Sequence, residues 1–381
     1  MTARQLRQYF LLVTAALVGF GCVAVYSATA VMGYQNTGST LSFFWKHLAA
    51  VAIGAAAAIG CLACAPASLR RSAKWLVGVS LVSLVLVRLL APEIGGAHRW
   101  FRFGPLSIQP SEFAQLALVV YLADYLARKG AVLQDFTHGF LPPMLVAGAM
   151  TVLLLAQPDL GSSVVLWVTA ILMLAVAKAK PKHLGGLMAC GSIGVIALIF
   201  GEAYRRRRLL AFLNPWQDPQ GAGFQILQSY VAMANGGLAG QGLGDSMQKL
   251  FFLPGAHTDF IFAIIGEELG LIGVTLVMAL FVLFVTSGLR MAQSAEDPFC
   301  TFLILGCTTL IALKALVNMA VVTGLLPTKG LPLPFISYGG TSVVANLIAC
   351  GLMLMAHRHG ASTAALDQAV SIHRQPAGAV A

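Results

Sequence analysis

One carboxylate in the sequence is singled out by its neighbours. Asp259 follows the small, turn-prone residues of LPGAHT and precedes the apolar run FIFAIIG, so it stands at the start of a predicted membrane helix. A carboxylate at this position can cap the helix and interact favourably with the helix dipole. It can also act as a general base on a membrane-anchored molecule at the bilayer surface. Because His257 lies two residues earlier, a metal-binding His-x-Asp pair is a third alternative.

Positively charged and polar clusters form the second group of candidates. The most basic of them is a run of four consecutive arginines: Arg205, Arg206, Arg207 and Arg208. Such a run either contacts lipid phosphates in general or binds a pyrophosphate specifically. Gln109 and Glu112 open another apolar run, shortly after Arg99 and Arg102, and Asp159 stands in the tight connection QPDLGSS. Helix capping and interfacial anchoring explain these two clusters as well as binding does.

The elements that must position these residues are membrane helices. Hydrophobic residues make up 58% of the chain and charged residues only 10%, which excludes an ordinary soluble domain. Apolar runs of roughly 20 residues recur, whereas a membrane barrel would show short segments with period-two alternation. We predict an all-α integral membrane protein with about ten transmembrane helices, at residues 10–32, 45–64, 74–91, 110–127, 140–156, 160–177, 184–204, 260–289, 300–323 and 340–356.

The distribution of Lys and Arg predicts the orientation in the membrane. These residues concentrate in alternate short loops, which by the positive-inside rule face the cytoplasm, so we expect both termini to be cytoplasmic. The long segment 205–259, between the seventh and eighth spans, is then external. Within it Phe224, Leu227 and Val231 share one face at helical spacing, which predicts an interfacial helix at 223–235 lying along the bilayer surface.

The remaining composition gives no sign of a second domain or of a nucleic-acid partner. Residues 1–360 are expected to form a single membrane domain, and 361–381 a cytoplasmic tail that is disordered. All seven cysteines fall within or at the ends of predicted spans, so neither a disulfide framework nor a zinc site is expected. The net charge of +10 is accounted for by the cytoplasmic flanks and the arginine run, and no nucleic acid is needed to explain it.

Five stretches closely resemble motifs of a known family, in the expected order: GPLSIQPSEFAQLAL, QPDLGSS, FLNPWQDPQGAGFQ, AHTDFIFAIIGEELGLIG and LLPTKGLPLPFISYGGTS. The similarity runs from about residue 10 to 357. On these motifs the chain is identified as a member of the SEDS family (shape, elongation, division and sporulation proteins). It resembles the cell-division branch most, with the elongation branch second.

This resemblance implies a peptidoglycan glycosyltransferase that polymerises lipid II into glycan strands. The reaction would take place at the outer face of the bacterial cytoplasmic (inner) membrane, at the division septum. A class B penicillin-binding protein transpeptidase and other membrane proteins of the division machinery would be its partners. The family pattern places its essential aspartate at Asp259, which would take the proton from the acceptor hydroxyl. Outer cations would neutralise the undecaprenyl pyrophosphate leaving group, with or without a divalent cation such as Mg²⁺ or Mn²⁺.

The candidate substrate-binding residues on this view lie in the matching motifs and in the basic run: Arg205, Arg206, Arg207, Arg208, Arg102, Lys329, His257, Gln109, Glu112 and Ser337. The chain also departs from the family pattern. Phe251 and Gly255 replace two glutamates found in many division members, which concentrates the acid–base proposal on Asp259. Gln115 and Ser107 stand where the family often has cations, so the arginines must replace these in binding phosphate.

An unusual lysine inside the ninth predicted span, Lys314, is one reason to consider a transporter as an alternative function. Lys314 lies at roughly 15 Å depth by the helical rise, similar to Glu267 and Glu268 in the antiparallel eighth span, and we expect it to pair with one of these glutamates. Charges distributed through the bilayer would also suit a lipid II flippase or another transporter. A non-catalytic scaffold of the division machinery is the third alternative, and it would tolerate the loss of Asp259.

Overall fold

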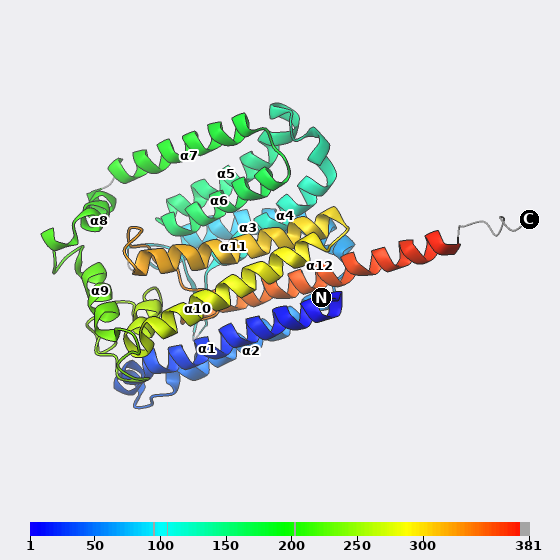
Figure 1. Ribbon diagram of the computed structural model, residues 1–381. Helices are drawn as coiled ribbons and strands as arrows, with labels where there is room; N and C mark the ends of the chain where they lie inside the picture. Colours follow the sequence, from blue (N-terminus) through cyan, green and yellow to red (C-terminus); the bar gives the residue numbers. More distant parts are fainter. Residues whose placement is uncertain (94–95, 105, 202, 374–381) are drawn as a thin grey trace, which may run out of the picture.

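The computed structural model describes residues 1–93, 96–104, 106–201 and 203–373, without the side chains at 103, 106, 131, 198–199, 203–205 and 361–373. It is a bundle of long helices with one small strand pair (Figure 1). Helix α1 (Ala3–Thr37) begins, and α12 (Gly340–His373) ends, at the same end of the bundle, which we name the terminal end. Helix α9 (Phe224–Gly236) lies at the opposite, distal end (Figure 1).

A helix covers each of the ten ranges predicted to span the membrane. Besides α1 and α12 these are α2 (Ser42–Leu62), α3 (Pro66–Leu90), α4 (Pro110–Lys129), α5 (Leu141–Ala156), α6 (Leu160–Val176), α7 (Pro181–Gly201), α10 (Ile261–Gln293) and α11 (Pro298–Val322). Within the described part of the chain, seven helices are long and apolar enough to cross a membrane, and α6 is a shorter apolar helix. The protein is therefore an all-α, multi-pass membrane protein, while the number of ten spans stays a prediction.

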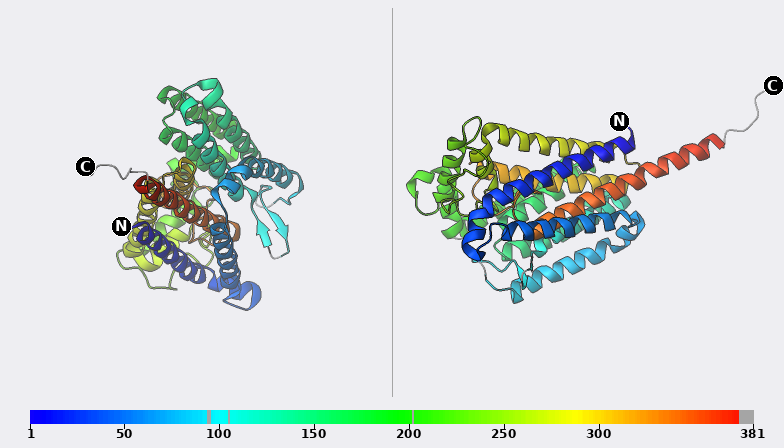
Figure 2. Two further views of the ribbon diagram at one scale, coloured as in Figure 1. Left: turned by 90° about the vertical axis from the view of Figure 1, so that its right-hand side faces the viewer. Right: turned by 90° about the horizontal axis from the view of Figure 1, so that it is seen from below.

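Helix α4 shows why composition alone undercounts the spans. It packs against α3, α5, α6, α11 and α12, and nearly all of its residues are buried by these neighbours. Its polar residues Glu112, Gln115 and Asp124 therefore face protein instead of lipid. Viewed along the bundle, α5 to α7 lie on one side of this centre and α1 and α2 on the other (Figure 2).

Shorter elements fill the connections. Strands β1 (Phe101–Phe103) and β2 (Leu106–Ile108) form an antiparallel hairpin, which projects beside the helices in Figure 2 and which the sequence analysis did not predict. A 3₁₀ turn, η1 (Gly130–Val132), and a π-helical turn, η2 (Phe136–Phe140), precede α5. The segment after α7 contains α8 (Ala203–Leu213), the 3₁₀ turn η3 (Pro215–Gln217) and α9. Helix α9 coincides with the predicted interfacial helix, whose position on the bilayer surface stays a prediction.

Helix α10 is interrupted at Gly270, whose φ of 62° and ψ of −158° are not helical. The loop 237–242 inserts beside this break and replaces the interrupted hydrogen bonds. The N–H groups of Gln241 and Gly242 donate to the carbonyls of Glu267 and Glu268, at 2.9 and 3.0 Å. The N–H groups of residues 271 and 272, which would bond these carbonyls in an unbroken helix, donate to the carbonyls of residues 237 and 238. The break therefore leaves these four backbone groups paired.

That Glu267 and Glu268 lie at membrane depth stays a prediction, and the structure shows that protein surrounds both side chains. The part of α10 before the break is buried under the loops that precede it, and its lipid-accessible side chains begin at Leu271 and Ile272, which are 51% and 66% exposed. The carboxylate of Glu268 lies 2.7 Å from Lys249 Nζ and accepts hydrogen bonds from the Ser27 hydroxyl. The carboxylate of Glu267 accepts bonds from Ser246 and from the backbone of residues 247 and 248.

The predicted pairing of Lys314 with Glu267 or Glu268 is wrong. Lys314 Nζ lies 2.6 Å from Oε2 of Glu112 at the start of α4, and both side chains are buried. The reason is that the loop 237–250 already satisfies the two glutamates of α10, while α4 packs directly against α11 and supplies a buried carboxylate. The lysine is therefore part of an α4–α11 contact.

Candidate active site

Asp259 is presented by the turn that leads into α10. The helix begins at Ile261 with Phe260 as its N-cap, and no described side chain caps it, so the capping role considered for Asp259 is not observed. The backbone of Asp259 is held by Asn318 of α11, whose amide donates to the carbonyls of Asp259 and Leu331 at 2.8 and 2.6 Å. This single buried amide fixes the aspartate and the 328–331 loop relative to each other.

The carboxylate of Asp259 lies against the backbone of Gly330. A Cβ atom at Gly330 would come within 3.1 Å of Asp259 Oδ2, which is tighter than an ordinary contact, so the glycine leaves room for the carboxylate. Burial raises the pKa of Asp259 to about 6, although the nearby Arg208 and Arg99 lower it and Asp159 raises it further. A pKa close to the ambient pH suits a group that must accept a proton and release it again.

Three charged groups from separate parts of the chain, Arg99, Arg208 and Asp159, thus act on the Asp259 carboxylate. Arg99 follows α3, and its guanidinium donates to the carbonyls of Gln157 and Pro158 in the α5–α6 connection, at 2.9 Å for Gln157. In the same connection Asp159 caps α6 by accepting from Ser162 N at 3.1 Å. Its Oδ2 is buried and has no hydrogen-bond partner among the described residues.

Lys329 is half-buried on the loop between α11 and α12. Burial lowers the pKa of its ammonium group, and the negative charge of Asp159 counteracts this effect. Since the same aspartate raises the pKa of Asp259, the two carboxylates and the lysine share one electrostatic environment. The result is a site of two carboxylates among three cations, at the distal end of the bundle.

A basic cavity of about 460 Å³ adjoins this site. Arg207, Arg208 and Gln225 line it together with residues of the 218–224 segment, Pro254 and Thr328. Arg208 donates to the carbonyl of Thr328 at 3.3 Å, and Thr328 immediately precedes Lys329. Arg208 therefore connects the cavity to the two carboxylates. The four-arginine run therefore divides: Arg206 is exposed and does not line the cavity, and the side chain of Arg205 lies outside the described residues.

Several other residues predicted to bind substrate have contacts within the protein, and their role in binding stays a prediction. Glu112 is paired with Lys314, and the backbone N–H of Gln109 donates to the Thr341 hydroxyl at 3.2 Å. Ser337 is buried, and its hydroxyl accepts from Leu333 N at 2.8 Å, closing a turn of the same loop.

The contacts of His257 and Arg102 are with residues other than the two carboxylates of the site. The ring of His257 packs against Phe43 and Tyr338, and burial lowers its pKa. Arg102 is exposed on β1, opposite Ser107. Among the described residues no group of three or more His, Cys, Asp or Glu side chains forms a metal-ligand set, so the His-x-Asp alternative gains no support from a third ligand.

Three residues of this site carry weaker signals in the sequence than Asp259 does. The sequence places Arg99 in a polar cluster and among the arginines that replace absent cations, and Asp159 in a cluster that helix capping explains as well as binding does. Asn318 was not considered at all, although a lone amide inside an apolar helix is a recognisable signal of a buried contact.

The fold and the site define a multi-pass helical membrane protein with a carboxylate and cation site at one end. The family model described as "Cell cycle protein", named for FtsW, RodA and SpoVE, matches residues 7–362. The chain belongs to this family.

Known relatives match along almost the whole chain. A probable peptidoglycan glycosyltransferase FtsW from Geobacter metallireducens is 45% identical over 352 residues, covering 90% of this chain and 92% of the relative. Stage V sporulation protein E from Bacillus subtilis is 39% identical over 352 residues, covering 91% and 96%.

Solved structures agree in fold. The rod shape determining protein RodA of Thermus thermophilus superposes with a TM-score of 0.68 at 26% identity, covering 92% of this chain and 96% of that one. A chain from a structure described as a peptidoglycan synthase complex that coordinates polymerization and crosslinking gives a TM-score of 0.75 at 28% identity, covering 92% and 97%.

Proposed function

We propose that this protein is a peptidoglycan glycosyltransferase that polymerises lipid II into glycan strands, with Asp259 as its general base. The observation that carries the proposal is the half-buried Asp259 with a pKa raised to about 6, held among Arg99, Arg208 and Lys329. Relatives named as peptidoglycan glycosyltransferases, which match this chain over nine-tenths of its length, support the same substrate class.

The reaction joins two lipid-linked sugars. Asp259 takes the proton of the acceptor 4-hydroxyl while that oxygen forms a bond to the anomeric carbon of the donor. The bond from the anomeric carbon to the phosphate oxygen breaks, its electron pair goes to undecaprenyl pyrophosphate, and the configuration at the carbon inverts. Arg208 and Arg207, which line the basic cavity, together with Lys329, balance the charge that develops on the leaving group. Asn318 and Gly330 position the base.

The buried charges argue against the transporter alternative. Lys314 is paired with Glu112, and Glu268 with Lys249, each at hydrogen-bonding distance inside the protein. Glu267 is satisfied by backbone N–H groups and a hydroxyl. These groups form separate closed contacts, whereas proton or ion coupling requires a connected series across the bilayer.

The relatives and the charge pattern support a proposal for the cellular setting. Because the FtsW-named relatives are more similar to this chain than its RodA structural neighbour, we assign it to division at the septum, with both termini cytoplasmic and the distal end outside. A class B penicillin-binding protein and other division proteins are the proposed partners. On this view ten helices span the inner membrane, α9 lies on its outer surface, and the chain after residue 360, in which α12 continues to His373, is a cytoplasmic tail.

Purified protein supplied with lipid II, with and without the partner transpeptidase, tests the proposal. We expect Asp259→Asn to remain folded and to associate with the partner but to make no glycan, whereas Asp245→Asn, which alters an exposed carboxylate at the distal end, should remain active. Glycan synthesis by Asp259→Asn at the wild-type rate would refute the base assignment.

The basic cavity is tested separately. Replacing Arg207 and Arg208 together by Gln should raise the KM for lipid II, because charge-assisted contacts to phosphate are lost. Arg206→Gln is the matched control, since Arg206 is exposed and does not line the cavity. An equal change in KM for both variants would reduce the run to a general membrane anchor.

A further inference from the structure

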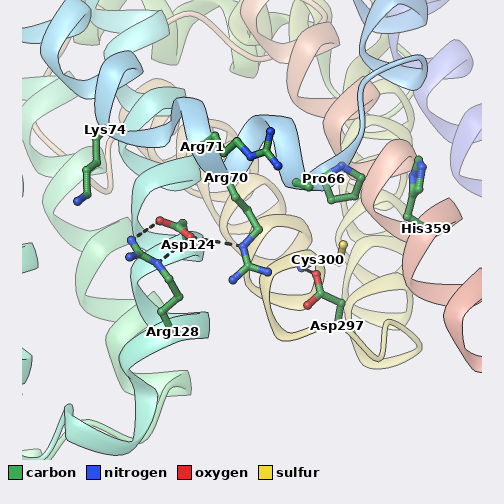
Figure 3. A pocket seen from close by; sticks show the side chains of 10 residues that line it. Pro66, Arg70, Arg71, Lys74, Asp124, Arg128, Asp297, Cys300 and His359 are labelled. Atoms are coloured by element: carbon green, nitrogen blue, oxygen red, sulfur yellow. Dashed lines mark hydrogen bonds and ion pairs between the residues drawn. The ribbon is translucent and has the colours of Figure 1, made fainter.

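A second cleft lies at the terminal end of the bundle, away from Asp259. It has a volume of about 770 Å³ and is formed where α3 and α11 begin and α4 and α12 approach their ends (Figure 3). We name it the arginine cleft, and define it by its lining residues: Pro66, Ala67, Arg70, Arg71, Lys74, Asp124, Arg128, Asp297, Cys300 and His359. The proposed glycosyl transfer uses none of these residues.

Two of its arginines are held in place by a buried acid. Asp124 of α4 is buried, accepts from Arg128 Nε at 3.0 Å and lies 3.5 Å from Arg70 Nε, as the dashed lines in Figure 3 show. The guanidinium of Arg70 also lies 5.4 Å from the ring centroid of Phe299. One negative charge thus fixes two positive ones, and the balance around Asp124 remains positive.

The other basic side chains have no such compensation. Arg71 and Lys74 make no ion pair within the part of the chain that the structure describes, and Asp297, the second acid of the cleft, is used to cap α11 through Cys300 N at 3.4 Å. The first turn of α3, at Pro66 and Ala67, adds the positive end of a helix dipole, since it has neither an acidic residue nor a side-chain cap. The cleft is therefore built to receive an anion.

The apolar surface beside the cleft indicates which anion. Trp75 lies one helical turn beyond Arg71 and is 79% exposed, as expected of an aromatic side chain at a membrane interface. Further along the same helix, Val79 and Val82 are exposed and apolar, as on a lipid-facing surface. A ligand with its charge in the cleft and an acyl chain along α3 would satisfy both surfaces, whereas a soluble anion would use only the first.

We propose that the arginine cleft binds the phosphodiester headgroup of an anionic phospholipid, with Arg71 and Lys74 as its principal ligands. With the termini in the cytoplasm this lipid belongs to the inner leaflet, so the lipid site is separate from the site of glycan synthesis. Basic side chains near the membrane are expected from topology alone. What distinguishes these is that they line one cavity that also contains a buried counter-charge, Asp124.

Binding is measured on the full-length protein in detergent by native mass spectrometry, with phosphatidylglycerol and the zwitterionic phosphatidylcholine as probes. We expect phosphatidylglycerol to be retained preferentially, and Arg71→Gln/Lys74→Gln to weaken its binding roughly 30-fold, about fivefold for each basic residue. The matched control is Lys180→Gln/Lys182→Gln, which removes two exposed cations near the start of α7, at the same end of the bundle. Neither variant touches the proposed catalytic residues, so lipid binding is scored independently of lipid II polymerisation.

Three outcomes overturn the proposal. Equal weakening by the two double variants would show that only overall surface charge matters. Equal retention of the two lipids would remove the role of the cations. Displacement of phosphatidylglycerol by millimolar inorganic phosphate, with no preference for the lipid, would show that the cleft holds a soluble anion.

Discussion

The ion pair between Lys314 of α11 and Glu112 of α4 allows a quantitative test of how these two helices are joined. Nζ and Oε2 are 2.6 Å apart, and the two side chains are only 2% and 3% exposed. Lys314→Met leaves the carboxylate of Glu112 buried without a counter-charge, which should cost about 3–5 kcal/mol of unfolding free energy. Glu112→Leu strands the lysine in the same way and should cost a similar amount.

The double variant Lys314→Met/Glu112→Leu removes both charges and fills the space with apolar side chains, so most of the loss should be regained. The coupling energy should then be about 3 kcal/mol or more, well above the roughly 0.5 kcal/mol within which independent sites add. Unfolding of the wild type, both single variants and the double variant in detergent micelles measures it, with the exposed Arg290→Met as a control that should change little. Additive single effects would refute the pairing.

Three other outcomes concern the site and the broken helix. Glycan synthesis should rise with pH through a midpoint near 6, because only deprotonated Asp259 accepts a proton. Arg208→Gln removes a cation that lowers the pKa of Asp259, so the midpoint of the rate–pH profile should move upward. An unmoved midpoint would contradict the electrostatic coupling between Arg208 and Asp259. Gly330→Ala brings a Cβ within 3.1 Å of Asp259 Oδ2, so the rate of glycan synthesis should fall by about tenfold or more. The unfolding midpoint should change little. A normal rate would mean that the position of the carboxylate is not critical. Gly270→Ala forces a side chain into a φ of 62° and places its Cβ 2.5 Å from Gly240 N, so it should lose at least about 1–3 kcal/mol in a micelle unfolding assay, and wild-type stability would argue against the break.

Much of the fold could be predicted because it depends on local composition. Apolar runs of helical length gave a helix at every predicted range, and the spacing of Phe224, Leu227 and Val231 gave α9. The hairpin β1–β2 was not predicted, since each of its strands is only three residues long and alternation cannot be recognised over such a length.

The missed features depend on contacts between distant segments. Glycine is common in membrane helices, so Gly270 by itself does not predict a break; the break is made possible by the loop 237–242, which supplies its hydrogen bonds. In the same way, helical depth predicts how far Lys314 lies along α11 but not which neighbouring helix it faces. Asp259 could be recognised from its position before an apolar run, whereas Arg99 and Asp159 join it only through the packing of α3, α5 and α6.

The break in α10 also divides the helix into two lengths with different surroundings. Only residues 271–293 carry the lipid-accessible surface of this helix, and at 1.5 Å per residue they extend about 34 Å, close to the thickness of a hydrocarbon core. The nine residues 261–269, about 13 Å long, are instead encased by protein. Asp259 stands immediately before this encased length, with Arg208 near its carboxylate. The sugar of a lipid-linked saccharide and the phosphate bonded to it must therefore reach the same protein-enclosed end of the helix together.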